Sequence, residues 1–234
     1  MKFQGYYINT NKRIMMAEKI EELKYDNPEF SEIKQNLFSY QSCKSYGSSC
    51  AHTATLTNCY YRRDLPIKSR EYRNCSLRIF SNMLYDTLVY EPYYFICEDN
   101  FYIINREYFE NFVRDFNNIK HSTEWDVILL THFGNNNYSF DNDLLNKNNF
   151  LRNKKNTNTT AYIVKQSMLI HIINTFERAM NDSEYFYDIN IFSFKNYWTD
   201  LQEKYKFYIY NRSFASIHKH IDDNELYHAP CMFN

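Results

Sequence analysis

Stretches of strand length and stretches of helix length alternate along this chain. Residues 93–99 (YYFICED) form an apolar run that suits a buried strand, and residues 106–119 (REYFENFVRDFNNI) repeat Phe at the spacing of an amphipathic helix. The run 125–133 (WDVILLTHF) is apolar enough for a strand that is buried on both faces. This alternation predicts an α/β domain with a mainly parallel central sheet flanked by helices.

Further periodic segments extend the pattern over most of the 234 residues. That length suits a single domain, which we expect to span residues 1–220, followed by a loosely ordered tail at 221–234. The polar, Asn-rich stretch 134–158 predicts a long surface loop. The remaining expected elements are strands at 2–9, 36–43 and 206–217, helices at 11–24, 76–89 and 192–205, and a strand that runs into a helix at 160–180.

Composition and charge narrow the classes of protein. The formal net charge is -1, so the chain lacks the strongly basic balance of a protein that binds nucleic acid through charge. The first residues have no apolar signal-peptide core, and no window approaches 18 apolar residues. We therefore expect a cytoplasmic protein with no membrane span and no nucleic-acid partner.

The six cysteines form no CxxC pair. Four of them fall within residues 43–75, near His52, but their spacing matches no zinc motif. Free and mostly buried thiols are the expected state in a reducing compartment.

An acidic turn ends the predicted strand at 93–99. Glu98, Asp99 and Asn100 follow a buried-looking run, although carboxylates and Asn are poor strand formers and ionised groups are costly to bury. Either the chain simply turns there, or these side chains hold a ligand. In parallel sheets ligands bind at the carboxyl ends of strands, which is where this turn is expected to lie.

The order of short motifs along the chain resembles glycosyltransferase family 25, which includes lipooligosaccharide galactosyltransferases and collagen galactosyltransferase domains. The resemblance covers roughly residues 3–220. The motifs that carry it are Asn9-Thr10 followed by Lys12-Arg13, then YGSSCAHTATL at 46–56, YFICEDN at 94–100, EWDVILL at 124–130, TTAYIVKQSMLIHII at 159–173 and NRSFASIHKH at 211–220.

This resemblance implies a single, Rossmann-like domain of the GT-A type. It implies inverting transfer of a hexose, with galactose or glucose favoured, from a UDP-sugar donor to a glycan or glycosylated protein. Manganese is the expected cofactor, and Glu98, Asp99 and Asn100 are its expected ligands. The chain departs from the family pattern at Asn100, where the family has a second Asp, and at Ala51, where it has Ser before the His.

The resemblance also implies which residues bind the donor. Asn9, Thr10 and Arg13 follow the first strand, where GT-A domains place the nucleotide, and helix capping is the alternative role for Asn9 or Thr10. His52 is a donor or acceptor contact, or else a partly buried histidine whose hydrogen bonds are satisfied within the protein. Asp99 is expected to contact the donor as well as the metal.

Later segments supply the remaining candidates. Thr160 and Tyr162 match a Thr-x-Ala-Tyr segment that lines the nucleotide-sugar and acceptor site, although Tyr162 also suits a core position. Lys219, between His218 and His220, is expected at the diphosphate. Asp188 is the candidate catalytic base, with Glu184 as the fallback, and a loop carboxylate is the alternative for Asp188. Trp125 and Asp126 match a family Trp-Asp pair, and core packing with local pairing is the stronger interpretation of them.

Three alternative functions stay open on sequence grounds. A protein that retains the fold but is catalytically impaired is favoured by Asn100, because an amide adds no negative charge for a metal ion. A nucleic-acid-binding protein is the second alternative, with aromatic side chains that stack on bases and the basic segment 147–156 at the phosphates. A magnesium-dependent nuclease that uses Glu98 and Asp99 is the third.

Overall fold

One eight-stranded sheet forms the centre of the structure, a computed structural model. It describes residues 1–10, 14–38, 92–98, 101–131, 138–139, 144–156, 160–185 and 194–217. The strand order is β2-β1-β3-β8-β5-β9-β7-β6, and β4 and β10 form a separate two-stranded sheet. The strands are β1 (Gly5–Thr10), β2 (Ile33–Phe38), β3 (Tyr93–Glu98), β4 (Phe101–Ile103), β5 (Val127–Leu129), β6 (Tyr138–Ser139), β7 (Phe150–Asn153), β8 (Ala161–Lys165), β9 (Phe207–Tyr210) and β10 (Ala215–Ile217).

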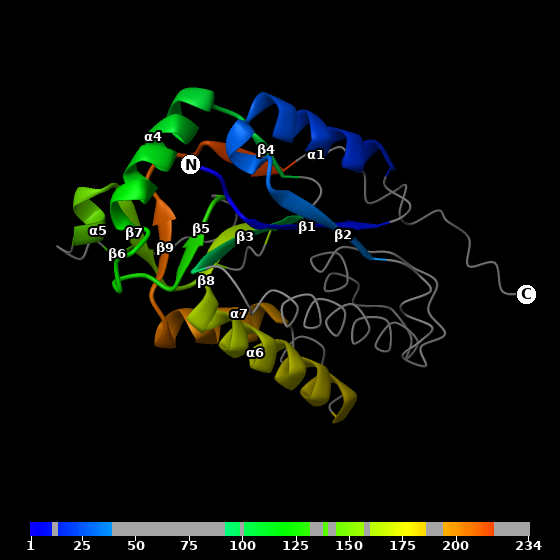
Figure 1. Cartoon of the computed structure of the whole chain (residues 1–234). Coiled ribbons are helices and arrows are strands. Elements are labelled where there is room, and N and C mark those ends of the chain that lie inside the picture. The colour runs from blue at the N-terminus through cyan, green and yellow to red at the C-terminus, as the bar shows by residue number, and fades with distance from the viewer. Residues whose placement is uncertain are drawn as a thin grey trace, which may run out of the picture.

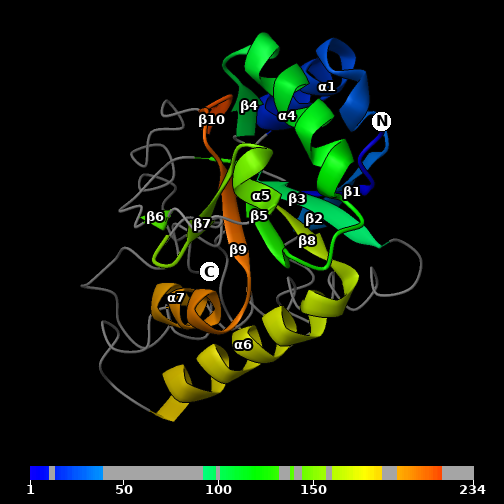
Figure 2. The ribbon, with the colours of Figure 1, turned by 90° about the vertical axis from the view of Figure 1, so that its left-hand side faces the viewer.

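Helices cover both faces of this sheet, so the domain has three layers. In Figure 1, α1 and α4 lie above the sheet and α6 and α7 lie below it, and Figure 2 shows the same layers after a quarter turn. The helical elements are α1 (Ile14–Asp26), the short 3-10 helix η1 (Pro28–Phe30), α4 (Arg106–Ile119), α5 (Leu144–Lys147), α6 (Gln166–Tyr185) and α7 (Phe194–Lys204). The predicted α/β class is confirmed.

Two hydrophobic cores fill the spaces between the layers. The upper core is rich in Phe: α4 contributes Phe109, Phe112 and Phe116, all fully buried, and Phe112 stacks on Phe214 at 4.7 Å between ring centroids. The lower core joins the other sheet face to α6 and α7, with Trp198 fully buried at its centre. The predicted inward face of the helix at 106–119 is therefore confirmed.

The predicted mainly parallel sheet is wrong in its strand directions, because the sheet is mixed. Three neighbouring pairs are parallel (β1–β2, β1–β3 and β5–β9), and four are antiparallel (β3–β8, β5–β8, β6–β7 and β7–β9). A parallel neighbour needs a long crossover connection, usually a helix. The strand β8 follows β7 after only a short polar segment, and it enters the sheet in the opposite direction to both of its neighbours.

Two further predictions about the elements are corrected. The polar stretch 134–158 is more than a surface loop, because it includes α5 and the sheet strands β6 and β7, and Phe150 of β7 is fully buried. The single last strand predicted at 206–217 is divided into β9 and β10, which belong to different sheets. The predicted helix at 76–89 and the tail at 221–234 lie outside the described residues.

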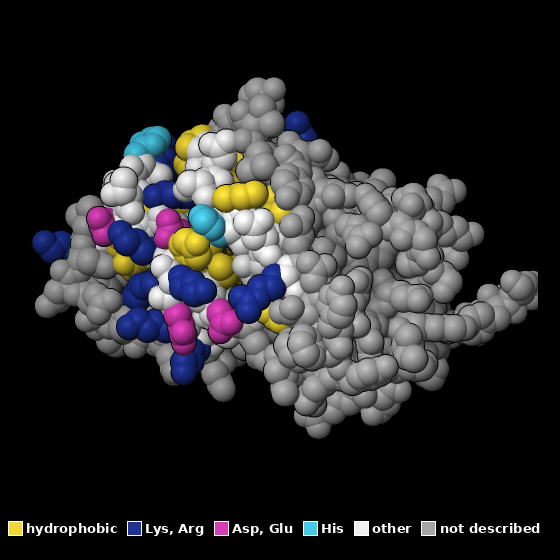
Figure 3. All heavy atoms as spheres, turned by 90° about the horizontal axis from the view of Figure 1, so that it is seen from below, with side chains coloured by type: hydrophobic (Ala, Val, Ile, Leu, Met, Phe, Trp, Pro, Cys, Tyr) yellow, Lys and Arg dark blue, Asp and Glu magenta, His cyan; other side chains and the backbone are white. Residues whose placement is uncertain are grey.

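Charged side chains of both signs share the lower face of the molecule. Seen from below, Lys and Arg side chains alternate with Asp and Glu side chains in the described part of this face (Figure 3). On and just after α7 the exposed side chains include Asp200, Glu203, Lys204 and Lys206. The described part of this face is therefore not a surface of one charge.

Candidate functional site

The sheet order creates a topological switch point between β1 and β3. The chain passes from β1 to β2 on one side of β1 and then returns to place β3 on the other side, and both neighbours are parallel to β1. Ligands of open α/β sheets bind outside the carboxyl ends of strands at such a point. The residues at this point are Asn9 and Thr10 at the end of β1 and Glu98 at the end of β3, with Ile8 paired to Glu98.

A third predicted segment reaches the same edge from the opposite direction. The strand β8 is antiparallel to β3, with Ala161 paired to Cys97, so Thr160 and Glu98 are the next residues outward on the two strands. Thr160 is buried. The structure therefore brings three sequence-predicted segments, which begin from residues 9, 98 and 160, to one edge of the sheet.

A continuous apolar row lies one step inside this edge. Tyr6 pairs with Ile96, Ile96 with Tyr162, Tyr162 with Leu129, and Leu129 with Ile209. All five pack in or against the lower core. Tyr162 is buried in this row, and its ring lies 5.4 Å from that of Trp198. The core position that was the alternative for Tyr162 is therefore where the structure places it.

The sequence analysis missed one polar residue at the edge, Thr131. It follows β5, and the backbone N–H of Leu130 donates to the carbonyl of Ala161 at 3.0 Å, so the β5–β8 pairing continues past Leu129. Thr131 and Thr160 are then the next residues outward on these two strands. Thr131 is 1% exposed and Thr160 is 4% exposed. A threonine that ends the apolar run 127–130 was the available signal in the sequence.

The small sheet connects the acidic turn to the C-terminal segment. In it Phe101 pairs with Ile217, and Ala215 pairs with Ile103. The described residue Phe101 follows directly after Asn100 in the chain, and Ile217 directly precedes His218. The two predicted donor-binding segments at 98–100 and 218–220 therefore continue from strand ends that are paired with each other.

Several predicted site residues lie outside the described residues. These are Arg13, His52, Asp99, Asn100, Asp188 and Lys219. For Asn9, Thr10, Glu98 and Glu184 the structure gives the backbone and not the side chain.

Trp125 and Asp126 lie at the opposite edge of the sheet, before the amino end of β5. Trp125 is fully buried, and its indole N–H donates to the carbonyl of Ile119 at 2.9 Å. Oδ2 of Asp126 accepts the backbone N–H of Lys206 at 2.8 Å, just before β9 begins. Core packing and local pairing, the stronger interpretation of this motif, are confirmed.

Lys165 gives this opposite edge its most perturbed described cation. Its Nζ lies 4.8 Å from the centre of the Trp125 ring and donates to the carbonyl of Ser122 at 2.5 Å. Burial lowers the pKa of Lys165, and the Asp126 carboxylate opposes that shift. These contacts tie β8 to the segment before β5, and they are remote from the switch point.

Within the described residues, no group of three or more His, Cys, Asp and Glu side chains lies close enough to hold a metal ion. The predicted ligand side chains of residues 98–100 are not among those described. Cys97 is a free, buried thiol as predicted, and the other cysteines lie outside the described residues. No helix in the described ranges has the length and apolar character needed to cross a membrane.

No protein-family model matches the chain, and no curated protein matches it significantly. The functional argument therefore rests on the residues and their arrangement.

Proposed function

We propose that this protein is a GT-A-type glycosyltransferase that transfers a hexose from a UDP-sugar to a glycan or glycosylated protein with inversion. The observation that carries the proposal is the arrangement at the switch point. Three segments chosen from sequence for donor binding, at residues 9–10, 98 and 160, converge on one edge of a sheet that sequence alone did not order. That edge is where α/β sheets bind nucleotides.

The pairing of β4 with β10 adds independent support. It starts the C-terminal segment that contains Lys219 from a strand paired with the one that follows Asn100. A sugar diphosphate needs cations near its phosphates and oxygen ligands for any metal ion that neutralises it. The two segments supply these two kinds of group.

The acidic turn fits a hard divalent cation, because its donor set consists of two carboxylates and an amide oxygen at a strand end. Glu98, Asp99 and Asn100 would hold manganese, which supplies positive charge to the leaving diphosphate when bound. The chain's own carboxylate, Asp188, accepts the proton of the acceptor hydroxyl as that oxygen bonds to the anomeric carbon. The bond from that carbon to the phosphate oxygen breaks, and UDP leaves.

Thermal unfolding of the full chain tests the donor site. The ligands are UDP, UDP-galactose, UDP-glucose and UDP-N-acetylglucosamine, each with and without manganese. A ligand at 100 times its dissociation constant stabilises the native state by about 2.7 kcal/mol. We expect a manganese-dependent rise in Tm that shrinks in Glu98→Gln and Asp99→Asn.

Glu203→Gln is the matched control, because it removes one carboxylate from an exposed position on α7. It should leave the ligand-induced shift unchanged. A shift without metal dependence would move attention to Arg13 and Lys219 as the diphosphate ligands. No shift with any nucleotide would overturn the proposal.

Asn100 favours a second candidate, a nucleotide-sugar-binding protein that is catalytically impaired. Release of UDP from each bound donor, followed with and without added glycans, separates the two. Manganese-dependent binding with no UDP release in any condition would favour the impaired protein, whereas steady release that Asp188→Asn abolishes supports the transferase.

A further inference from the structure

Two buried threonines stand beside the acidic end of β3, in the direction of β5. Thr160 and Glu98 are the first residues beyond the pair Ala161–Cys97, and Thr131 and Thr160 are the first beyond the pair formed by Leu130 and Ala161. Glu98, Thr160 and Thr131 therefore occupy successive positions across three neighbouring strands. Residues at such directly opposite positions have Cβ atoms about 4.5–5.5 Å apart, within reach of hydroxyl and carboxylate groups.

The change from apolar to polar side chains at this row is abrupt. One step inside, the same three strands carry Ile96, Tyr162 and Leu129, which pack in the lower core. Thr131 and Thr160 are nevertheless as buried as those residues. A buried hydroxyl is costly unless it is hydrogen-bonded, and a valine would fit an apolar position of the same shape without that cost.

We infer that Thr160, backed by Thr131, is a positioning residue that holds the Glu98 carboxylate for a divalent cation. A threonine hydroxyl donates one hydrogen bond and accepts others, so Thr131 can donate to Thr160 while Thr160 donates to a carboxylate oxygen. Carboxylates that ligate metals are usually held by such outer hydrogen bonds, and losing one commonly costs about 10- to 100-fold in metal affinity. The inference rests on the proposed function, since the cation belongs to the proposed donor site.

Manganese titration of the full chain tests the inference directly. Free manganese is followed by its electron paramagnetic resonance signal, first alone and then with saturating UDP, and Tm is measured in parallel. Thr160→Val should raise the half-saturating manganese concentration by about 10- to 100-fold. Thr131→Val should act in the same direction with a smaller effect, because it acts through Thr160.

Conservative variants separate positioning from simple destabilisation. Thr160→Ser and Thr131→Ser keep the hydroxyl and should restore manganese affinity close to that of the wild type. Thr175→Val is the matched control, because it removes a hydroxyl that donates to the carbonyl of His171 at 2.7 Å within α6. It should leave manganese affinity unchanged.

The outcomes distinguish this inference from the proposed function. Unchanged manganese affinity in both valine variants would overturn the inference, and so would weakening that serine fails to restore. UDP binding that needs no manganese in the wild type would overturn the inference and leave the donor site standing. A wild type that binds no nucleotide at all would overturn both.

Discussion

Tyr210 and Asp115 are 95 residues apart in the chain, and the Tyr210 hydroxyl donates to Oδ2 of Asp115 at 2.7 Å. The same oxygen accepts Nδ2 of Asn149 at 2.8 Å, and both Asp115 and Tyr210 are buried. Asn149 has φ of 64°, in the left-handed region that Asn tolerates better than most residues. One carboxylate on α4 thus joins the helix to the end of β9 and to the turn that precedes β7.

The first prediction concerns this hydrogen bond at alkaline pH. Burial, with the hydrogen bond to Asp115 as the second cause, raises the pKa of Tyr210 above its usual 10. The unfolded chain then loses this proton before the native state does, so the Tyr210 contribution to stability is complete below pH 10 and falls as pH rises above 10. Between pH 9 and pH 11 the wild type should lose about 1 kcal/mol more of its free energy of unfolding than Tyr210→Phe.

Denaturant unfolding at a series of pH values measures that difference. At pH 7 the Tyr210→Phe variant should be less stable by about 2 kcal/mol, the usual range for a hydrogen bond to a charged group. Tyr25→Phe is the matched control, because Tyr25 is 89% exposed, and it should follow the wild type throughout. A Tyr210→Phe variant with the same alkaline profile as the wild type would contradict the prediction.

The α/β class and most core-facing positions followed from the sequence because they depend on local periodicity. The Phe spacing along α4 and the apolar run of β5 repeat at the periods of a helix and a buried strand, so each segment indicates its own structure. Strand direction is different, because it depends on which distant strands pair. Nothing within residues 161–165 specifies that β8 lies between β3 and β5 and antiparallel to both.

The same distinction applies to the candidate site. The acidic end of β3 was apparent because charged residues interrupt an apolar run. Thr131 was not, because a single threonine after an apolar run also ends many ordinary strands, and its position beside Thr160 depends on long-range pairing. The connection of residues 98–100 with 218–220 likewise arises from the pairing of β4 with β10, which no local pattern encodes.

The second prediction concerns Gln202, a fully buried amide on α7. Its side chain accepts the backbone N–H of Asn156 at 2.8 Å and donates to the carbonyl of Asn156 at 2.5 Å, as a neighbouring strand would. Gln202→Leu removes both partners from that backbone and should cost about 2–4 kcal/mol. Chemical denaturation measures the loss. Glu203→Leu, at the exposed neighbouring position, should change stability little, and equal losses in the two variants would argue against the buried amide as the cause.

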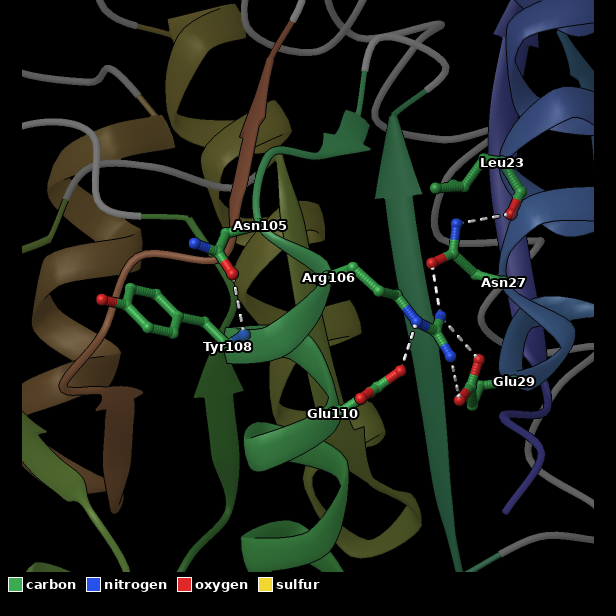
Figure 4. Close-up of polar contacts among 7 residues, drawn as sticks. All are labelled: Leu23, Asn27, Glu29, Asn105, Arg106, Tyr108 and Glu110. Carbon is green, nitrogen blue, oxygen red and sulfur yellow. Dashed lines mark hydrogen bonds and ion pairs between the residues drawn. The ribbon is translucent and has the colours of Figure 1, made fainter.

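The third prediction concerns Arg106, at the first residue of α4 (Figure 4). Its guanidinium donates to both carboxylate oxygens of Glu29 at 2.9 and 3.1 Å and to Oδ1 of Asn27 at 2.6 Å, and it also pairs with Glu110. Lysine keeps the charge but cannot form the two-pronged contact. Arg106→Lys should therefore lower the free energy of unfolding by about 1 kcal/mol, a value limited by partial solvent exposure.

Thermal and urea unfolding of Arg106→Lys give the measurement, with Lys19→Arg as the control. Lys19 pairs with Glu22 at an exposed position on α1, where exchange of one cation for another should have no measurable effect. If Arg106→Lys is as stable as the wild type, the contact between α4 and the α1–η1 segment depends on charge alone.

The fourth prediction concerns Gly5, where β1 approaches β3 too closely for a side chain. A Cβ atom at this position would lie 1.8 Å from the carbonyl oxygen of Phe95, which belongs to the backbone and cannot rotate away. Gly5→Ala must separate the two strands at the base of the switch point, with a cost of about 3 kcal/mol. A lowered Tm measures it. Gln4→Ala, one residue earlier, is the control, and similar Tm values for the two variants would contradict the prediction.

The fifth prediction concerns Asn100, the departure from the acidic pattern in the proposed metal site. An amide oxygen can ligate manganese but brings no negative charge, whereas Asn100→Asp adds a carboxylate to the same position. A charge at coordination distance in a partly solvated site contributes on the order of 1–4 kcal/mol, so manganese affinity should rise by about tenfold or more. Titration of manganese in the presence of UDP gives the change in half-saturating concentration. Asn174→Asp adds the same charge at an exposed position on α6 and is the control for a general electrostatic effect. If both variants change manganese affinity equally, or neither does, Asn100 is not a ligand, and the metal site would then depend on Glu98 and Asp99 alone.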